Sequence, residues 1–110
     1  MIEQAQEEAL SVIKEIETNP ATTQRSVSKK LGISLGKTNY LLKELIAKGL
    51  IKGESFSANP GKLKKISYIL TAKGFEEKMR LTYHFLKIKE MEYKLLKEEW
   101  EKSNGNKEQL

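Results

Sequence analysis

Residues 33–51 have the sequence ISLGKTNYLLKELIAKGLI, and the predicted architecture depends on them. In a helix from Leu35 to about Lys48, residues three and four apart share a face. One face then packs inward through Thr38, Leu41, Leu42 and Leu45, flanked by Leu35 and Ile46. The other carries Gly36, Tyr40, Lys43 and Ala47, with Lys37 and Asn39 at its margins and a single acid, Glu44, at its edge. We expect this second face to meet a polyanion.

Basic residues are concentrated in the middle of the chain. Its 110 residues correspond to one ordinary domain, and the absence of cysteine excludes a disulfide framework. Residues 24–73 hold eleven Lys or Arg against two Glu, although the net charge of the whole chain is only +5. Such a region is typical of nucleic-acid binders; a generic basic surface is the plainer alternative. No apolar run could span a membrane and no signal peptide is recognisable, so a cytoplasmic location is expected.

Two shorter helices are predicted before this segment. Apolar residues recur at helical intervals over residues 2–17, and Pro20, which lacks an N–H, follows the end of that helix. In the next helix Thr23 is a suitable N-cap, and Gly32 can adopt the positive φ at which a helix turns. Because Ser34 can cap the following helix, the pattern predicts a helix-turn-helix, whose second helix can lie in a DNA groove.

A basic hairpin is predicted to follow. Residues 50–57 and 62–70 have the composition of strands, and Ala58-Asn59-Pro60-Gly61 between them is a strong turn signal. One strand face is expected to hold Ile66, Tyr68 and Leu70. Three lysines stand beside the tip of this wing: Lys62, Lys64 and Lys65.

A long, charge-rich helix is predicted to close the chain. Thr71 is expected to cap a helix over residues 72–102, and Ser103-Asn104-Gly105 to end it. A heptad-like seam, imperfect at Thr82 and Lys89, runs along this helix. Its apolar members, the predicted dimer interface, are Phe75, Met79, Leu86, Tyr93, Leu96 and Trp100. A second apolar line is Leu81, Phe85, Ile88 and Leu95. A short domain core cannot cover both lines along about 45 Å of helix, so we expect a coiled-coil homodimer.

The predicted fold class is therefore mainly α with a small β-hairpin. Residues 1–72 would form a winged helix-turn-helix domain, residues 73–103 a dimerisation helix and residues 104–110 a flexible tail. No catalytic or metal-binding constellation is present: His84 is the only histidine, and the acids of the last helix alternate with lysines as on a solvent face. We expect no cofactor, no metal and no enzyme activity.

Three stretches resemble the MarR-type bacterial transcriptional regulators. They are TQRSVSKKLGIS (residues 23–34), LGKTNYLLKELIAKGLI (residues 35–51) and YILTAKG (residues 68–74). The combination of S-L-G-K-x-N-Y with LTAKG is similar in particular to the EPS-associated subfamily, which is linked to exopolysaccharide gene clusters. Ser28 departs from the family, which usually has alanine at this helix–helix contact. The chain also lacks the further terminal helices with which fuller MarR proteins build a ligand pocket, which leaves a small-molecule effector undecided.

The resemblance implies which residues contact DNA. Base contacts would come from Gly36, Lys37, Asn39, Tyr40 and Lys43. Contacts to the DNA backbone would come from Thr23, Gln24, Arg25 and Ser34, and wing contacts from Lys62, Lys64 and Lys65. The chemistry agrees, because Asn can pair bidentately with adenine and Lys can donate to guanine or phosphate. We expect a homodimer on double-stranded DNA; the alternative is a winged-helix module that binds an acidic protein.

Overall fold

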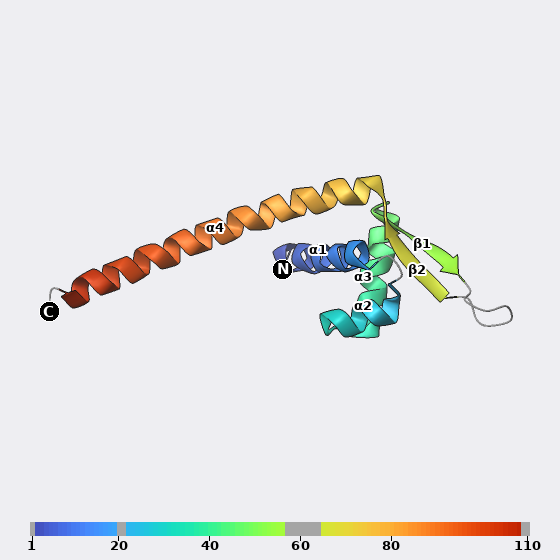
Figure 1. Cartoon of the computed structure of the whole chain (residues 1–110), viewed down its shortest axis with the longest axis horizontal. Helices are drawn as coiled ribbons and strands as arrows, with labels where there is room; N and C mark the ends of the chain where they lie inside the picture. Colours follow the sequence, from blue (N-terminus) through green and yellow to red (C-terminus); the bar gives the residue numbers. More distant parts are fainter. Residues whose placement is uncertain (1, 20–21, 57–64, 109–110) are drawn as a thin grey trace.

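The computed structural model describes residues 2–19, 22–56 and 65–108. Its elements are α1 (Ile2–Thr18), α2 (Gln24–Leu31), α3 (Leu35–Ala47), β1 (Ile51–Phe56), β2 (Lys65–Leu70) and α4 (Ala72–Glu108). The first five, with residues 72–88 of α4, form a compact unit that we call the head, and the rest of α4 projects away from it (Figure 1). The molecule is accordingly elongated, measuring 76 × 25 × 23 Å. The predicted fold class is confirmed.

Local capping chemistry sets the ends of α2 and α3. Thr23 Oγ1 accepts a hydrogen bond from the backbone N–H of Ser26 at 3.2 Å, and Ser34 Oγ accepts one from the N–H of Lys37 at 3.1 Å. Each cap satisfies a donor that the first helical turn leaves free. Between the two helices Gly32 adopts φ 66° and ψ 33°, the left-handed conformation that only glycine enters without steric cost. These three predicted positions are confirmed.

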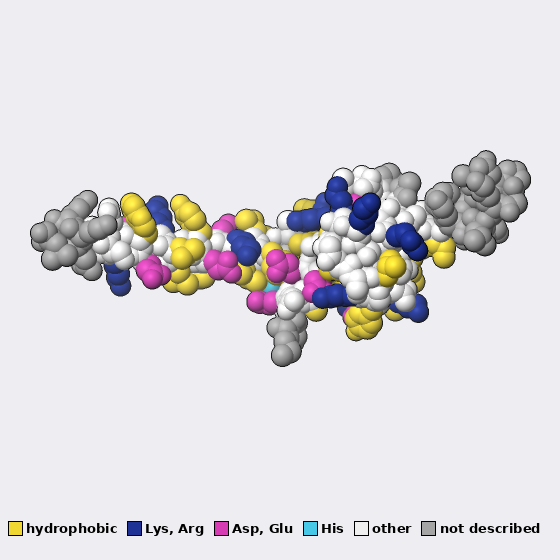
Figure 2. Space-filling view, turned by 90° about the horizontal axis from the view of Figure 1, so that it is seen from below, with side chains coloured by type: hydrophobic (Ala, Val, Ile, Leu, Met, Phe, Trp, Pro, Cys, Tyr) yellow, Lys and Arg dark blue, Asp and Glu magenta, His cyan; other side chains and the backbone are white. Residues whose placement is uncertain are grey.

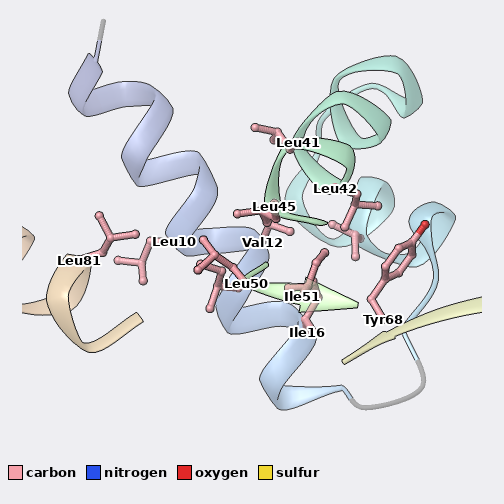
Figure 3. Close-up of a cluster of buried hydrophobic side chains, with 12 residues drawn as sticks. Leu10, Val12, Ile16, Leu41, Leu42, Leu45, Leu50, Ile51, Tyr68 and Leu81 are labelled. Carbon is pink, nitrogen blue, oxygen red and sulfur yellow. The ribbon is translucent and has the colours of Figure 1, made fainter. Parts of the chain in front are cut away.

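The core of the head lies between α1, α3 and the hairpin (Figure 3). The α3 residues that it buries are the predicted Thr38, Leu41, Leu42 and Leu45. The other buried apolar residues are Leu10, Val12, Ile13, Ile16, Val27, Leu50, Ile51, Tyr68 and Leu81. Leu42 is 1% exposed, so its burial contributes roughly 1.5–3 kcal/mol. This packing fixes the direction of α3 and leaves its opposite face free.

The two strands pair antiparallel, with Ile51 opposite Leu70 and Gly53 opposite Tyr68. This register places Tyr68 and Leu70 on one face of the hairpin, as the alternation predicted. The predicted outer ends of the strands, residue 57 and residues 62–64, lie outside the described residues. The expected turn at residues 58–61 and the lysines Lys62 and Lys64 lie outside the described residues.

Thr71 joins the start of α4 to the end of α3. Its hydroxyl accepts a hydrogen bond from the N–H of Gly74 at 3.0 Å, which confirms the predicted cap. The same hydroxyl lies 2.7 Å from the carbonyl oxygen of Gly49 and 3.0 Å from that of Leu50, and its backbone N–H donates to Leu50 at 3.0 Å. The direction of the long helix is therefore tied to the segment that follows α3, a connection that the sequence did not predict.

The predicted end of the long helix is wrong. The helix continues through Ser103-Asn104-Gly105 to Glu108, so the expected boundary between residues 73–103 and a tail of residues 104–110 falls inside α4. Gly105 does not take the positive φ that would stop a helix. The reason is that Asn and Gly lower helix propensity by only about 1 kcal/mol or less, which a following helical turn can offset.

Candidate nucleic-acid interface

The outward face of α3 is open, polar and cationic. Tyr40 is 65% exposed, Lys43 is exposed and Asn39 is half-buried. A Cβ at Gly36 would have nothing within 4 Å, so a ligand could approach the backbone closely there. Glu44, the one acid within α3, is paired with Lys48 at 3.3 Å on the flank of the helix. The structure thus brings four of the five predicted base-contacting residues onto one accessible surface.

The first turns of α2 and α3 are joined to each other. Gln24 Nε2 donates to the backbone oxygen of Leu35 at 3.2 Å. At the other end of the turn, the hydroxyl of Ser28 donates to the backbone oxygen of Ile33 at 2.6 Å. Ser28, where the family usually has alanine, therefore holds the turn between the helices. Two helix N-termini, each with partly free N–H groups, lie side by side, and such termini favour anions.

Unpaired cations surround this surface. Five exposed Lys and Arg side chains in residues 22–56 have no acidic partner among the described residues. They are Arg25, Lys29, Lys30, Lys43 and Lys52. Figure 2 shows Lys and Arg side chains spread over the head, while acidic side chains are more frequent toward α4. The positive potential that the charge distribution predicted is therefore located on the head. Lys65, from the predicted wing set, is the first residue of β2.

Lys37 lies at the edge of this outward surface, and its side chain lines the same groove as Tyr40. Its Nζ lies 2.7 Å from Oε1 of Glu8 on α1, on the flank of α3. A groove of about 620 Å³ lies between α1, α3 and the start of α4, and Lys37 and Glu8 line it. Its other lining cations include Lys48, paired with Glu44, and Arg80, paired with Glu77. Sequence reasoning missed Glu8, because no local pattern shows which α3 residue a neighbouring helix will face.

A second surface is the apolar side of α4. The exposed large apolar side chains of this helix are Phe75, Met79, Tyr83, Leu86, Met91, Tyr93, Leu95, Leu96 and Trp100. They include all six residues predicted for the dimer interface, and each is more than half exposed. In the second apolar line, Leu81 is buried at 3% and Phe85 is half-buried, whereas Leu95 is 57% exposed. Exposed patches of this kind mark surfaces that bind another molecule.

The resolved pKa shifts lie away from the outward face of α3. Burial raises the pKa of Tyr68, and the hydrogen bond and charge of Glu77 raise the pKa of Arg80. Among the described residues, no three His, Cys, Asp or Glu side chains gather as metal ligands would. None of the described helices has both the length and the apolar composition needed to cross a membrane.

Comparison with known proteins supports the architecture. A family model described as winged helix-turn-helix DNA-binding matches residues 9–52, from within α1 to the start of β1. Twenty-six chains of solved structures also match. MepR of Staphylococcus aureus, a regulator of the multidrug efflux pump MepA, is 24% identical, with 90% of this chain and 72% of MepR covered and a TM-score of 0.63. The fold is that of the MarR-type regulators.

Two further MarR-type structures show the same likeness. FabT of Streptococcus pneumoniae, solved in complex with DNA, is 24% identical with a TM-score of 0.58, covering 76% of this chain and 57% of FabT. MarR of Staphylococcus aureus, solved with salicylate and kanamycin, is 24% identical with a TM-score of 0.57. The match covers 76% of this chain and 53% of that MarR chain. The chain thus spans little more than half the length of these proteins. No curated protein matches it.

Proposed function

We propose that the chain is a sequence-specific, double-stranded DNA-binding transcriptional regulator. The observation that carries this proposal is the exposed, acid-poor face of α3, with Gly36, Asn39, Tyr40 and Lys43 and unpaired cations on α2 beside it. A helix with its opposite face packed and this face free can enter a major groove. The joined N-termini of α2 and α3 supply N–H groups for phosphates.

Each side chain has a defined role in this proposal. Asn39 reads adenine and Lys43 reads guanine, while Tyr40 lies against a sugar or a thymine methyl group. Arg25 and the capping residues Thr23 and Ser34 hold the helix pair on the DNA backbone. The close approach at Gly36 allows the first turn of α3 to sit against the duplex.

The proposed assembly is a homodimer in which two copies of α4 pack through their exposed apolar faces. The six seam residues are unpartnered in one chain, and burying them requires a partner with the same pattern. A parallel arrangement keeps both heads at the same end, where two α3 helices can meet one duplex. The operator is then a pseudo-palindrome with half-sites about 10 bp apart, or a multiple of one DNA turn.

Exopolysaccharide gene clusters are the proposed place to look for operators. This part of the proposal comes from the resemblance of S-L-G-K-x-N-Y, residues 34–40, to the EPS-associated regulators. Selection of bound fragments from genomic DNA with the purified chain tests it without assuming a target.

Mobility shifts on a selected fragment, with random duplex as competitor, test the mechanism. Lys43→Ala is expected to weaken binding to the selected site by about 1–3 kcal/mol and binding to random DNA much less. Arg25→Ala, the control, is expected to weaken binding to the selected site and to random DNA to a similar extent, because a phosphate contact is independent of sequence. Equal effects of the two substitutions would contradict the division between base and backbone contacts. A chain that binds no DNA, but captures an acidic protein, would favour the interaction-module alternative.

A further inference from the structure

The ion pair between Lys37 and Glu8 joins α3 to α1, two helices that contact each other at a steep angle (Figure 1). The Nζ of Lys37 donates to Oε1 of Glu8 at 2.7 Å, and the same oxygen faces the Nε2 of Gln4 at 3.4 Å. The side chain of Glu8 is 23% exposed and that of Lys37 is 44% exposed. The pair is thus accessible, and its acidic member is held on the surface of α1 beside the first turn of α3.

The pairing sets Lys37 apart from Lys43, the other lysine expected to contact bases. Lys43 has no acidic partner within the described part of the chain. A cation that neutralises a phosphate releases a counterion and raises the salt dependence of DNA binding. Lys37 can do so only by leaving Glu8, which would place an unpaired carboxylate beside the duplex. The net electrostatic gain from Lys37 is then close to zero.

We propose that Glu8 is a positioning residue that withholds Lys37 from DNA and so limits the electrostatic attraction to any duplex, random sequence included. This inference rests on the proposed DNA-binding function and deepens it. Base-reading contacts from Asn39 and Lys43 are unaffected by the pair, whereas the sequence-independent attraction is lowered by one cation. Because this attraction acts on every duplex, Glu8 lowers the affinity for selected and random DNA by a similar factor.

A double-mutant cycle with Glu8→Gln and Lys37→Met tests the proposal. The affinity of the full chain for a random duplex is measured between about 50 and 200 mM salt. Glu8→Gln is expected to steepen the slope of log affinity against log salt by about 0.9 and to raise affinity roughly five- to tenfold near 0.1 M. Lys37→Met alone frees the Glu8 carboxylate, so it is expected to lower affinity slightly, and by less than it does in the Glu8→Gln variant. In the double variant the gain from Glu8→Gln is expected to disappear.

Glu7→Gln is the matched control. Glu7 lies on the same helix, is exposed, and has no ion pair within the described residues. The substitution changes the net charge as Glu8→Gln does, so a much smaller effect on the slope separates the ion pair from a general charge effect. Circular dichroism verifies that each variant keeps the fold.

Two outcomes would overturn the inference while leaving the proposed function standing. One is an unchanged slope in Glu8→Gln. The other is that Lys37→Met lowers affinity equally in the unmodified chain and in the Glu8→Gln variant. Lys37 would then contact DNA whether or not Glu8 is present. Absence of DNA binding in the unmodified chain and in every variant would contradict the proposed function itself, and the inference with it.

Discussion

The two halves of α4 both carry large apolar side chains, but their surroundings differ. In the first half, Leu81 is buried beside Leu10 of α1 (Figure 3) and Phe85 is partly buried against the core, while Thr71 hydrogen-bonds to the segment that follows α3. In residues 89–108 the described apolar side chains are more than half exposed, and the helix projects from the head (Figure 1). The first half is therefore held by contacts within the chain. The second half also has large apolar side chains, but none of the described elements covers them.

This difference indicates that the first half of α4 stabilises the head, whereas the second half is available to join two chains. Ion pairs within α4, such as Lys87 with Glu90 and Lys89 with Glu92, are exposed and join residues three apart. Pairs of this type contribute only about 0.3–0.5 kcal/mol each. They cannot account for an uncovered helix with a row of large apolar side chains, whereas burial against a second copy can. On this account the head binds DNA and the projecting half of α4 joins two heads.

The largest expected effect comes from comparing two glycines in the same helix. A Cβ at Gly74 would lie 1.9 Å from the backbone oxygen of Leu50, whereas a Cβ at Gly105 would have nothing within 4 Å. Gly74→Ala is expected to lower the free energy of unfolding by about 4 kcal/mol or more, because backbone atoms must move. Gly105→Ala is expected to raise it by up to about 1 kcal/mol. Urea denaturation measures both. Similar stability of the two variants would contradict the close packing of the helix start.

A smaller effect is expected from comparing two leucines. Leu45 is 3% exposed and Leu96 is 67% exposed. Leu45→Ala is expected to lower the free energy of unfolding by about 3 kcal/mol and to leave association unchanged. Leu96→Ala is expected to raise the dissociation constant of the dimer roughly tenfold or more, because each dimer loses two side chains. Sedimentation equilibrium measures association. An unmodified chain that stays monomeric, or a dimer insensitive to Leu96→Ala, would show that this face does not pair copies.

The smallest expected effect on stability is at Gly36, and its sign differs from the effect on binding. Gly36→Ala adds a methyl group to open space in a helix, so we expect stability to rise by up to about 1 kcal/mol. The same methyl group would stand between α3 and DNA, so affinity for a selected site is expected to fall several-fold. Thermal melts and mobility shifts measure the two quantities. Unchanged affinity in a stabilised variant would remove Gly36 from the DNA contact.

The parts of the fold that depend on residues adjacent in the sequence could be predicted. Thr23, Ser34 and Thr71 act as caps, and Gly32 takes the left-handed conformation, because each feature depends on two to four adjacent residues. The end of α4 was mispredicted at Ser103, where only a weak propensity argued for a stop.

Features that depend on how helices pack could not be predicted. The side chain of Lys37 belongs to the polar face of α3 by periodicity, yet it meets Glu8, which is 29 residues earlier in the chain. Likewise, the contacts of Thr71 with Gly49 and Leu50 arise only when the hairpin returns to the end of α3. The DNA-contacting residues themselves stay a prediction.

The central claim is that two heads, joined by α4, bind one DNA duplex. Its most direct test is sedimentation of the purified chain with a selected fragment between about 50 and 200 mM salt. We expect two chains per site and an affinity that falls by roughly 10³-fold over this range, as for a protein with about six phosphate contacts. One chain per site, or an affinity that stays flat across these salt concentrations, would contradict it.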